Sequence, residues 1–270
     1  MSELTVGALL RDWRQRRRLS QMDLALAVNV STRHLSFVET GRSRPSAELV
    51  LALADGLEIP LRERNTLLLA AGYAPRYPAR PLEDEAMEPA REAVQRMLDA
   101  HDPYPGVVVD RAWNIVMANQ AASAITAGIP DELLGPPANV YRISLHPEGL
   151  AKRTLNFPEW AEHLLQQLAR SVVLTGDPAL ASLEAEVRAY PGVAEAVATK
   201  ASPLERAPLL VPFRMDLGNG VELSLFTTLT TFGTPRDVTL EELAVELFYP
   251  ADDESARLLG GRGSTASALN

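Results

Sequence analysis

Apolar residues recur at helical spacing through the first 70 or so residues of the chain. In the first helix, which Thr5 can cap, they follow the i, i+3, i+4, i+7 pattern at Val6, Leu9, Leu10 and Trp13. Ser46 begins a fourth helix of the same kind, and a fifth runs from Leu61 to Ala71 before Gly72. With the two helices described next, this pattern predicts a compact all-helical unit of five short helices.

Residues 20–45 predict two short helices joined by a tight turn. Ser20 followed by Asp23 is a capping-box variant that begins the first of them. Ser31 can cap the second, and Gly41 is suited to end it in a left-handed conformation. Two helices of this size and spacing are typical of a pair that reads DNA.

The second of these helices has an outward face that geometry defines. If Leu35 and Val38 point inward, a repeat of 3.6 residues per turn places four residues on the opposite side of the helix and one beside them. The four are Arg33, Ser36, Phe37 and Thr40, and the flanking residue is Thr32. We take this set as the candidate reading face.

The residue types on this face suit a DNA duplex. Arg33 could pair bidentately with a guanine edge and Phe37 could touch a thymine methyl group, while Arg42 and Arg44 are placed for phosphates. A solvated outer face is the plain alternative for any amphipathic helix. Phe37 argues against it, because an outward phenylalanine needs a base, a second subunit or another domain as partner.

Further along, the pattern changes to a linker and then to mixed elements. Residues 74–88 are rich in proline and charge and predict a linker, after which Pro89 to Ala100 returns to helical spacing. Short apolar strands at Val107 to Val109 and Ile115 to Met117 predict a hairpin. We expect a short helix over 120–127 and a loop over Pro130 to Asn139.

The remaining elements are long helices followed by strands. Helices are expected over Leu155 to Leu174 and Pro178 to Tyr190, then a short linker at Pro203 to Pro208. The arms Leu209 to Leu217 and Val221 to Phe232 flank the turn Gly-Asn-Gly and form the clearest hairpin. Leu243 to Tyr249 alternates as a fifth strand, although helix stays open there because two glutamates precede it. The tail from residue 259 is small and polar, which predicts disorder.

Charge is divided unevenly between the two parts. The chain has 270 residues, 46% hydrophobic, and a formal charge of -9. Residues 1–80 hold 12 of the 26 basic residues and 8 of the 35 acidic ones, so the remainder carries 14 against 27. A basic first module on an acidic body suits a protein in which only the first module meets phosphate. The arginines Arg14, Arg16, Arg17 and Arg18 fit a helix dipole, a DNA backbone or a merely solvated basic face.

Several kinds of chemistry have no residues to carry them. The absence of cysteine rules out disulfides, thiolate metal sites and cysteine nucleophiles. The four histidines are scattered without metal spacing, the two lysines fit no serine-lysine pattern, and no glycine-rich phosphate loop occurs. We therefore expect no enzyme, no cofactor and no metal. Without an apolar run of membrane length or a secretory signal, we expect a soluble cytoplasmic protein.

Residues 20–75, about a quarter of the chain, resemble a known family. The runs RHLSFVETGRSRPS and PLRERNTLLLAAGYAP are similar to the N-terminal domain of Xre-type, lambda-repressor-like regulators, in the subgroup with an MmyB-like ligand-binding domain. The resemblance implies a phosphate or base-edge contact for Gln21. It also implies base reading by Thr32, Arg33, Ser36 and Phe37, in agreement with the geometry above.

The second part resembles the MmyB-like ligand-binding domain itself. The resemblance rests on DPYPGVVVDRAWNIVMAN, LHPEGLA, NFPEWAEHLL and TTFGTPRDVTLEELAVELFYPADD and on their order. It implies a PAS-type antiparallel five-stranded sheet with helices and a small-molecule sensor, with an acyl chain such as a fatty acid as a reasonable apolar ligand. The expected domains are then 1–73 for helix-turn-helix, 74–95 for the linker, 96–258 for the ligand-binding domain and 259–270 for the tail.

Candidate pocket residues come from the long helix and the strands. The apolar candidates are Phe157, Trp160, Leu164, Phe213, Leu225 and Phe226, all of which plain core packing would also explain. His146, Arg153 and Arg214 could orient a polar head such as a carboxylate. Arg153 could instead pair with Glu159 or Glu162.

The sequence therefore predicts a transcriptional regulator that binds DNA in a manner controlled by a small apolar ligand. Helix-turn-helix modules read half-sites as two-fold dimers, so we expect a homodimer and a palindromic operator. The first alternative is a protein-interaction module whose helix-turn-helix does not bind DNA and whose second domain serves to dimerise. The second alternative is an enzyme with a DNA-binding head, which would turn over its ligand.

Overall fold

The computed structural model describes residues 5–199 and 210–260, and the chain divides into two compact units. The first unit contains residues 1–87 together with 232–241, and the second contains 88–231 and 242–270. The expected linker at 203–208 and the tail beyond residue 260 lie outside the described residues.

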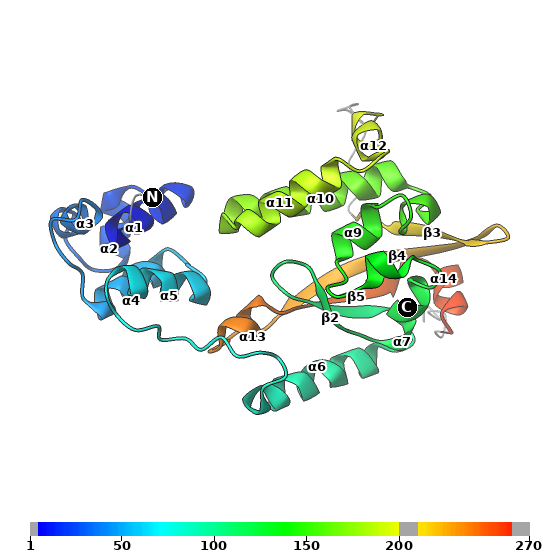
Figure 1. Ribbon diagram of the computed structural model, residues 1–270, viewed down its shortest axis with the longest axis horizontal. Coiled ribbons are helices and arrows are strands. Elements are labelled where there is room, and N and C mark those ends of the chain that lie inside the picture. The colour runs from blue at the N-terminus through cyan, green and yellow to red at the C-terminus, as the bar shows by residue number, and fades with distance from the viewer. Residues whose placement is uncertain (1–4, 200–209, 261–270) are drawn as a thin grey trace, which may run out of the picture. The chain divides into compact units, whose positions relative to one another are not determined.

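The first unit has the five short helices that the periodicity predicts (Figure 1). They are α1 (Val6–Arg16), α2 (Gln21–Ala27), α3 (Thr32–Glu39), α4 (Ala47–Gly56) and α5 (Leu61–Ala70). One apolar cluster joins them, with Leu10, Leu24 and Leu53 fully buried. Burial of these side chains is the main force that holds such short helices, since few helices of this length are stable alone.

Side-chain caps begin four of the five helices. The hydroxyl oxygens of Thr5, Ser20, Ser31 and Ser46 each accept a hydrogen bond from the backbone N–H three residues later. The capping box of α2 is complete, because the Asp23 carboxylate also accepts from the Ser20 N–H at 3.1 Å. Gly41 follows α3 with φ +73°, which confirms its left-handed ending.

The helix α5 begins differently. Its N-cap position is Pro60, which offers no side-chain cap. Instead the carboxylate of Glu241 accepts a hydrogen bond of 2.6 Å from the backbone N–H of Leu61. A residue 180 positions away in the chain therefore supplies the cap that the local sequence lacks.

Glu241 belongs to a segment, residues 232–241, that clusters with the first unit although it lies between two strands of the second. Within the first unit the Val238 N–H donates to the Pro78 carbonyl at 2.8 Å, and Arg80 pairs with Asp237 at 2.9 Å. The short helix α13 (Val238–Glu242) ends this segment, and the chain continues directly into β5.

The second unit contains one sheet and the remaining helices. Its strands are β1 (Gly106–Val109), β2 (Ile115–Ala118), β3 (Phe213–Gly218), β4 (Val221–Thr231) and β5 (Ala244–Pro250). After the short η1 (Glu85–Met87), its helices are α6 (Glu88–His101), α7 (Gln120–Ile125), α8 (Asp131–Leu134), α9 (Val140–Leu145), η2 (Ala151–Arg153), α10 (Phe157–Thr175), α11 (Pro178–Arg188), α12 (Val193–Thr199) and α14 (Asp253–Leu258). Both expected hairpins and both long helices are confirmed, as is the strand alternative for residues 243–249.

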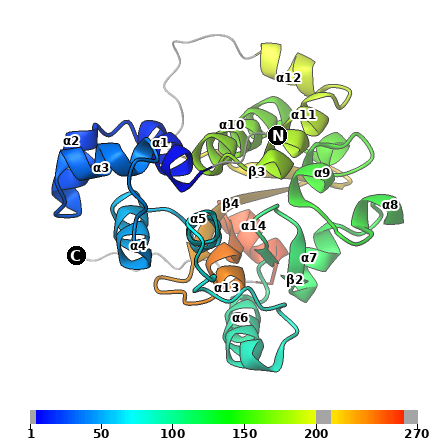
Figure 2. The same ribbon diagram turned by 60° about the vertical axis from the view of Figure 1, so that its left-hand side comes forward.

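The sheet is antiparallel throughout, with the order β2-β1-β5-β4-β3. Helices cover both of its faces: α9, α10 and α11 lie on one side and α6 on the other (Figures 1 and 2). Side chains of β1 and β5 alternate between these faces, so that Val107 lies beside Glu246 and Val108 beside Val245. This architecture confirms the expected five-stranded antiparallel domain with helices.

The expectation of an irregular loop over Pro130 to Asn139 is corrected, because α8 occupies 131–134 within it. The short helices α9, α12, α13 and α14 were not expected either. Helices of four to seven residues lack enough periodicity to be recognised, and contacts with the rest of the fold stabilise them.

Candidate functional site

The helix α3 presents two different faces. Leu35 and Val38 are each 1% exposed and pack into the core of the first unit, as their spacing predicts. On the other side Thr32 and Arg33 are exposed, Ser36 and Phe37 are half-buried, and Thr40 is exposed at the end of the helix. The structure therefore brings the five residues of the candidate reading face together on one short helix.

Phe37 is shielded by a neighbour on its own helix. The guanidinium carbon of Arg33 lies 5.3 Å from the centre of the Phe37 ring, a cation–π geometry one helical turn apart. Arg33 itself is exposed and Phe37 is half-buried. The pair offers a planar hydrogen-bond donor and an apolar ring on one exposed surface.

Beneath this face lies a buried ion pair that sets the position of α3. The Arg14 guanidinium of α1 donates to both carboxylate oxygens of Glu39, at 2.7 and 2.9 Å. The Gln21 side-chain amide of α2 donates to the same carboxylate at 2.8 Å. Burial by itself would raise the pKa of Glu39, but the hydrogen bonds from Arg14 and Gln21 outweigh it and the pKa is lowered.

This network revises the interpretation of the arginines at the end of α1. Arg14 is buried against Glu39, so it is not part of a solvated or phosphate-facing cluster. Arg17 donates to the carbonyls of Leu57 and Glu58 at the end of α4, where cations suit the helix dipole.

The two arginines beyond α3 differ from each other. Arg42 is exposed, whereas the Arg44 guanidinium donates twice to the Ala71 carbonyl, at 2.9 and 3.2 Å, and lies over the ring of Tyr73. Arg44 thus already ties the end of α3 to the end of α5. A phosphate contact by Arg44 remains a prediction that must coexist with these bonds.

The second unit has a partly open cavity of about 70 Å³ between its sheet and helices α7, α9 and α10. Its lining is Pro105, Val107, Ile115, Ala122, Ile125, Thr126, Val140, Ile143, Ser144, Leu150, Trp160, Leu164, Phe213, Glu246 and Phe248. Nearly all of these side chains are apolar. The cavity is small beside the roughly 300 to 1,000 Å³ of pockets that hold drug-sized ligands.

Glu246 is the charged exception in this lining. It sits on β5 opposite Val107 of β1 and Leu229 of β4, and it is 7% exposed. Among the residues that the structure describes, its Oε2 atom has no hydrogen-bond partner. Burial raises the pKa of Glu246 to about 7, although a hydrogen bond with Thr227 acts in the opposite direction.

The expected pocket residues divide into two groups. Trp160, Leu164 and Phe213 line the cavity. Leu225 is fully buried in the core, Phe157 packs at its edge, and Phe226 stacks on Tyr249 with ring centres 5.3 Å apart.

The three polar candidates lie outside the cavity lining. His146 contacts the Tyr190 ring at 4.9 Å and accepts from the Glu148 N–H. Arg153 donates to the carbonyls of Ile125, Ala127 and Asp216 at 3.3 to 3.5 Å. Arg214 forms a bidentate pair with Glu222 across β3 and β4, an exposed site. The charged residue in the cavity lining is instead Glu246. The alternation of apolar and polar residues along β5 would place this residue on a solvated face.

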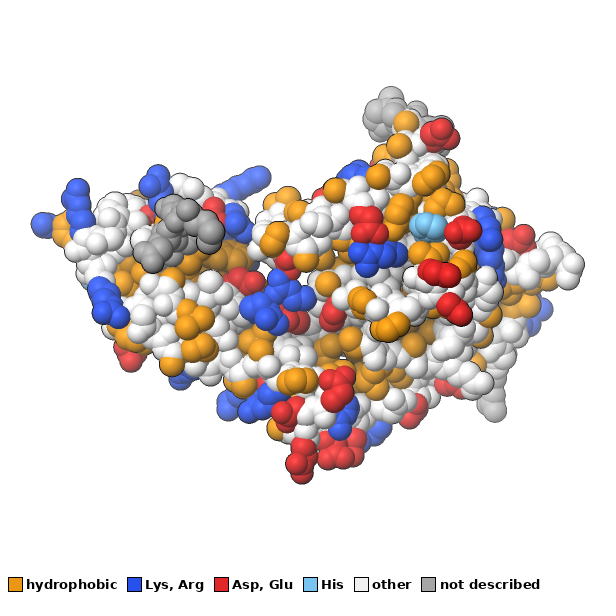
Figure 3. All heavy atoms as spheres, in the orientation of Figure 1, with side chains coloured by type: hydrophobic (Ala, Val, Ile, Leu, Met, Phe, Trp, Pro, Cys, Tyr) orange, Lys and Arg blue, Asp and Glu red, His pale blue; other side chains and the backbone are white. Residues whose placement is uncertain are grey.

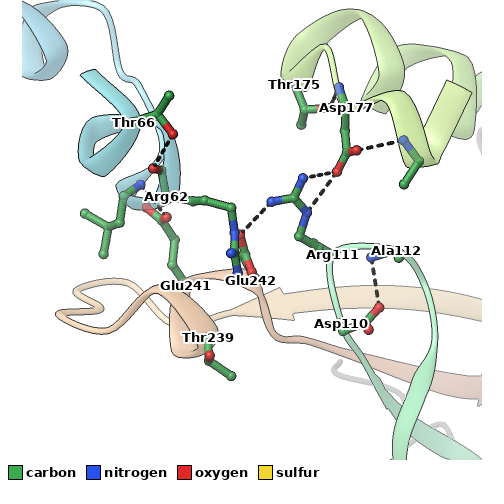
Figure 4. Close-up of polar contacts among 12 residues, drawn as sticks. Arg62, Thr66, Asp110, Arg111, Ala112, Thr175, Asp177, Thr239, Glu241 and Glu242 are labelled. Carbon is green, nitrogen blue, oxygen red and sulfur yellow. Dashed lines mark hydrogen bonds and ion pairs between the residues drawn. The ribbon is translucent and has the colours of Figure 1, made fainter. Parts of the chain in front are cut away.

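An ion-pair network holds the edge of the second unit next to β5. Arg111, in the turn between β1 and β2, donates to Asp177 at the start of α11 and to Glu242 at 3.2 Å (Figure 4). Asp177 also caps α11 by accepting from the Ala179 N–H at 2.8 Å. Glu241 and Glu242 are adjacent in the chain. The Glu241 carboxylate is bonded to Leu61 within the first unit, and the Glu242 carboxylate is bonded to Arg111 within the second.

Charged side chains follow the division seen in the sequence. Figure 3 shows several basic side chains on the displayed face of the first unit and acidic ones gathered over α6. No helix among the described residues is long and apolar enough to cross a membrane. In the same described ranges, no group of three or more His, Asp or Glu side chains is placed to hold a metal ion.

Comparison with known families assigns both units. Residues 90–260 match the MmyB-like transcription regulator ligand binding domain, and residues 5–67 match a helix-turn-helix domain. The first match spans more than half of the chain.

Similar proteins include HTH-type transcriptional regulators of Mycobacterium bovis and Mycobacterium tuberculosis that are themselves uncharacterized. Each is 39% identical over 71 residues, which is 26% of this chain and 28% of the relative. Among solved structures, the clp gene regulator ClgR of Corynebacterium glutamicum is 26% identical over 38% of this chain and 96% of its own, with a TM-score of 0.23. An RNA-binding Light-Oxygen-Voltage receptor is 14% identical over 93% of this chain and 59% of its own, with a TM-score of 0.25. TM-scores this low do not establish a shared fold.

Proposed function

The chain belongs to the family of MmyB-like transcription regulators, and on this premise we propose that a small apolar ligand in the second unit controls sequence-specific DNA binding by α3. The observation that carries the proposal is the two-sided character of α3. Its buried side fixes the helix through Leu35, Val38 and the Arg14–Glu39 pair. Its open side presents Arg33 and Phe37, whose chemistry suits base edges.

The remaining candidates complete a DNA contact surface around this helix. Thr32, Ser36 and Thr40 flank Arg33 and Phe37, and Arg42 and Arg44 follow for phosphates. Gln21 lies at the start of α2, where its side-chain amide donates to Glu39, and a phosphate or base-edge contact by Gln21 is part of the proposal. A homodimer would place two such surfaces on a palindromic operator.

The ligand site proposed is the cavity beneath the sheet of the second unit. Trp160, Leu164 and Phe213 supply apolar contacts there. A long acyl chain would require the lining to move apart, because about 70 Å³ holds only a few atoms. A compact apolar ligand is therefore favoured.

We propose residues 232–241 as the route by which the ligand acts on DNA binding. This segment packs with the first unit through Glu241 and Val238, and the chain then enters β5, which lines the cavity with Glu246 and Phe248. A ligand that shifts β5 would change the free energy of these contacts, which is the differential interaction that any control requires.

The proposal is tested by selecting bound sequences from random duplex DNA with the full chain and measuring affinity against salt concentration. Phosphate contacts predict a steep linear fall of log K with log salt, and selection should yield an inverted repeat. A helix-turn-helix that binds a protein partner instead would show shallow salt dependence and no enriched sequence. Native mass spectrometry before and after denaturation reports the subunit count and the mass of any retained ligand.

A further inference from the structure

Glu246 lines the cavity and has a buried carboxylate oxygen that lacks a hydrogen-bond partner among the described residues. Oε2 of Glu246 has no hydrogen-bond partner among the described residues, and the residue is more than nine-tenths buried. Buried polar atoms in native proteins are nearly always paired, since an unpaired one loses the full free energy of its hydration. An unpaired acceptor in a cavity wall therefore indicates a hydrogen-bond donor that binds from outside the chain.

The rest of the lining narrows the chemistry of that donor. Apart from Glu246, the polar groups among the lining side chains are the hydroxyls of Thr126 and Ser144 and the indole N–H of Trp160, and none of the fifteen lining residues is Lys, Arg or His. A ligand with a carboxylate head would bring a second negative charge beside Glu246 with no cation to offset it. A ligand with an ammonium head would supply both the missing hydrogen bond and the missing opposite charge.

We propose that the cavity binds a compact apolar amine whose ammonium group donates to the carboxylate of Glu246. The proposal rests on the ligand-controlled function proposed above and specifies its ligand class. The hydrocarbon part of the amine would contact Trp160, Leu164 and Phe213. The cavity volume limits that part to a few carbon atoms unless the walls move.

The position of Glu246 would allow a bound amine to change the stability of β5 as well as fill the cavity. Glu246 lies in the centre of the sheet, paired with both β1 and β4, on the strand that residues 232–241 enter. An ammonium that pairs with this carboxylate stabilises β5 in its present place. Amine binding therefore acts on the same strand that we propose as the route to the first unit.

The test compares three probes of equal chain length on the full protein: butylamine, 1-butanol and butyrate, titrated by NMR at pH 7.5. We expect butylamine to bind roughly ten-fold or more tightly than butyrate, with butanol between them, because a charge-assisted hydrogen bond contributes about 1.5 to 3 kcal/mol. Glu246→Gln keeps the side-chain shape and should remove this preference. Glu222→Gln, which changes an exposed carboxylate of the same sheet, should retain it.

The outcomes separate this inference from the function on which it rests. Butyrate binding as tightly as butylamine, an unchanged preference in Glu246→Gln, or no binding of any probe at millimolar concentration would each overturn the amine proposal. If butyrate or butanol binds best and changes DNA affinity, ligand control stands and only the ligand class is wrong. Circular dichroism of Glu246→Gln establishes that the variant is folded.

Discussion

The Arg14 guanidinium on α1 donates two hydrogen bonds, of 2.7 and 2.9 Å, to the Glu39 carboxylate at the end of α3. The side chains are 11% and 1% exposed, so water does not screen the pair. Gln21 of α2 completes the arrangement. Three helices that share one buried carboxylate keep the candidate reading face of α3 in a fixed orientation.

Replacing Glu39 with glutamine should destabilise the first unit by about 3 kcal/mol, because Arg14 would remain buried without its counter-charge. Hydrogen exchange of α1 and α3 in the full chain measures this loss locally. Asp12→Asn is the matched control, since Asp12 pairs with Arg16 on the surface and contributes about 0.5 kcal/mol at most. Equal exchange rates in the two variants would show that the buried pair does not orient α3.

Arg33→Ala and Arg42→Ala should weaken DNA binding in different ways. Loss of Arg33 removes a base contact, so we expect preference at one operator position to relax at a cost of about 1 to 3 kcal/mol. Loss of Arg42 removes a phosphate contact, so binding to all sequences should weaken similarly and the salt slope should fall by about 1. Fluorescence anisotropy on operator and random duplexes distinguishes the two effects. An Arg33 variant with unchanged affinity and preference would show that α3 does not read bases.

Glu241→Gln should loosen the start of α5 and weaken the response of DNA binding to ligand. The substitution removes the negative charge that caps the Leu61 N–H, a contribution of about 1 kcal/mol. Hydrogen exchange at the start of α5 should rise, and the change in DNA affinity caused by butylamine should shrink. Glu254→Gln is the control, because α14 retains its cap from Asp252. A full ligand response in Glu241→Gln would rule out residues 232–241 as the route.

Glu246 should make the stability of the second unit fall as pH rises. Its carboxyl ionises near 4.5 when unfolded, whereas burial raises the folded pKa to about 7. The folded state therefore binds the proton more tightly, and stability is lost as pH rises between these values, by roughly 2 to 3 kcal/mol between pH 5 and pH 8. Urea unfolding at pH 5 and pH 8 should show this loss in the native protein and not in Glu246→Gln. A pH dependence that is the same in both would contradict the assignment of a buried, unpaired carboxyl.

Sequence periodicity predicted the elements that short-range interactions form. The caps at Thr5, Ser20, Ser31 and Ser46 depend on residues three positions apart, and so does the apolar face of each helix. The inward turn of Leu35 and Val38 and the left-handed Gly41 follow from the same local rules. For this reason the outward face of α3 follows from the spacing of its apolar residues alone.

Strand order was less accessible, yet the arrangement of strands and helices along the chain and its motifs indicated the five-stranded sheet. Alternation suggested which side of β4 is buried, and Leu223 and Leu225 are indeed buried. Alternation did not reveal the role of Glu246 on β5, where the charged residue stands between Val245 and Leu247. Helices cover both faces of this sheet, so a charged residue on an alternating strand has no solvated side to face.

Tertiary structure alone decided three further matters. Arg14, which the sequence places in a cluster of arginines, is buried in the structure and pairs with Glu39, 25 positions away. Glu241 became the cap of a helix 180 positions earlier, and Glu246 became the polar group of the cavity. The role of each of these three residues depends on which residues from distant parts of the chain surround it. Burial and the partner set the free energy of each charge, and the local sequence pattern encodes neither. The sequence by itself determined the short helices and their faces, and the folded chain determined which charges those faces enclose.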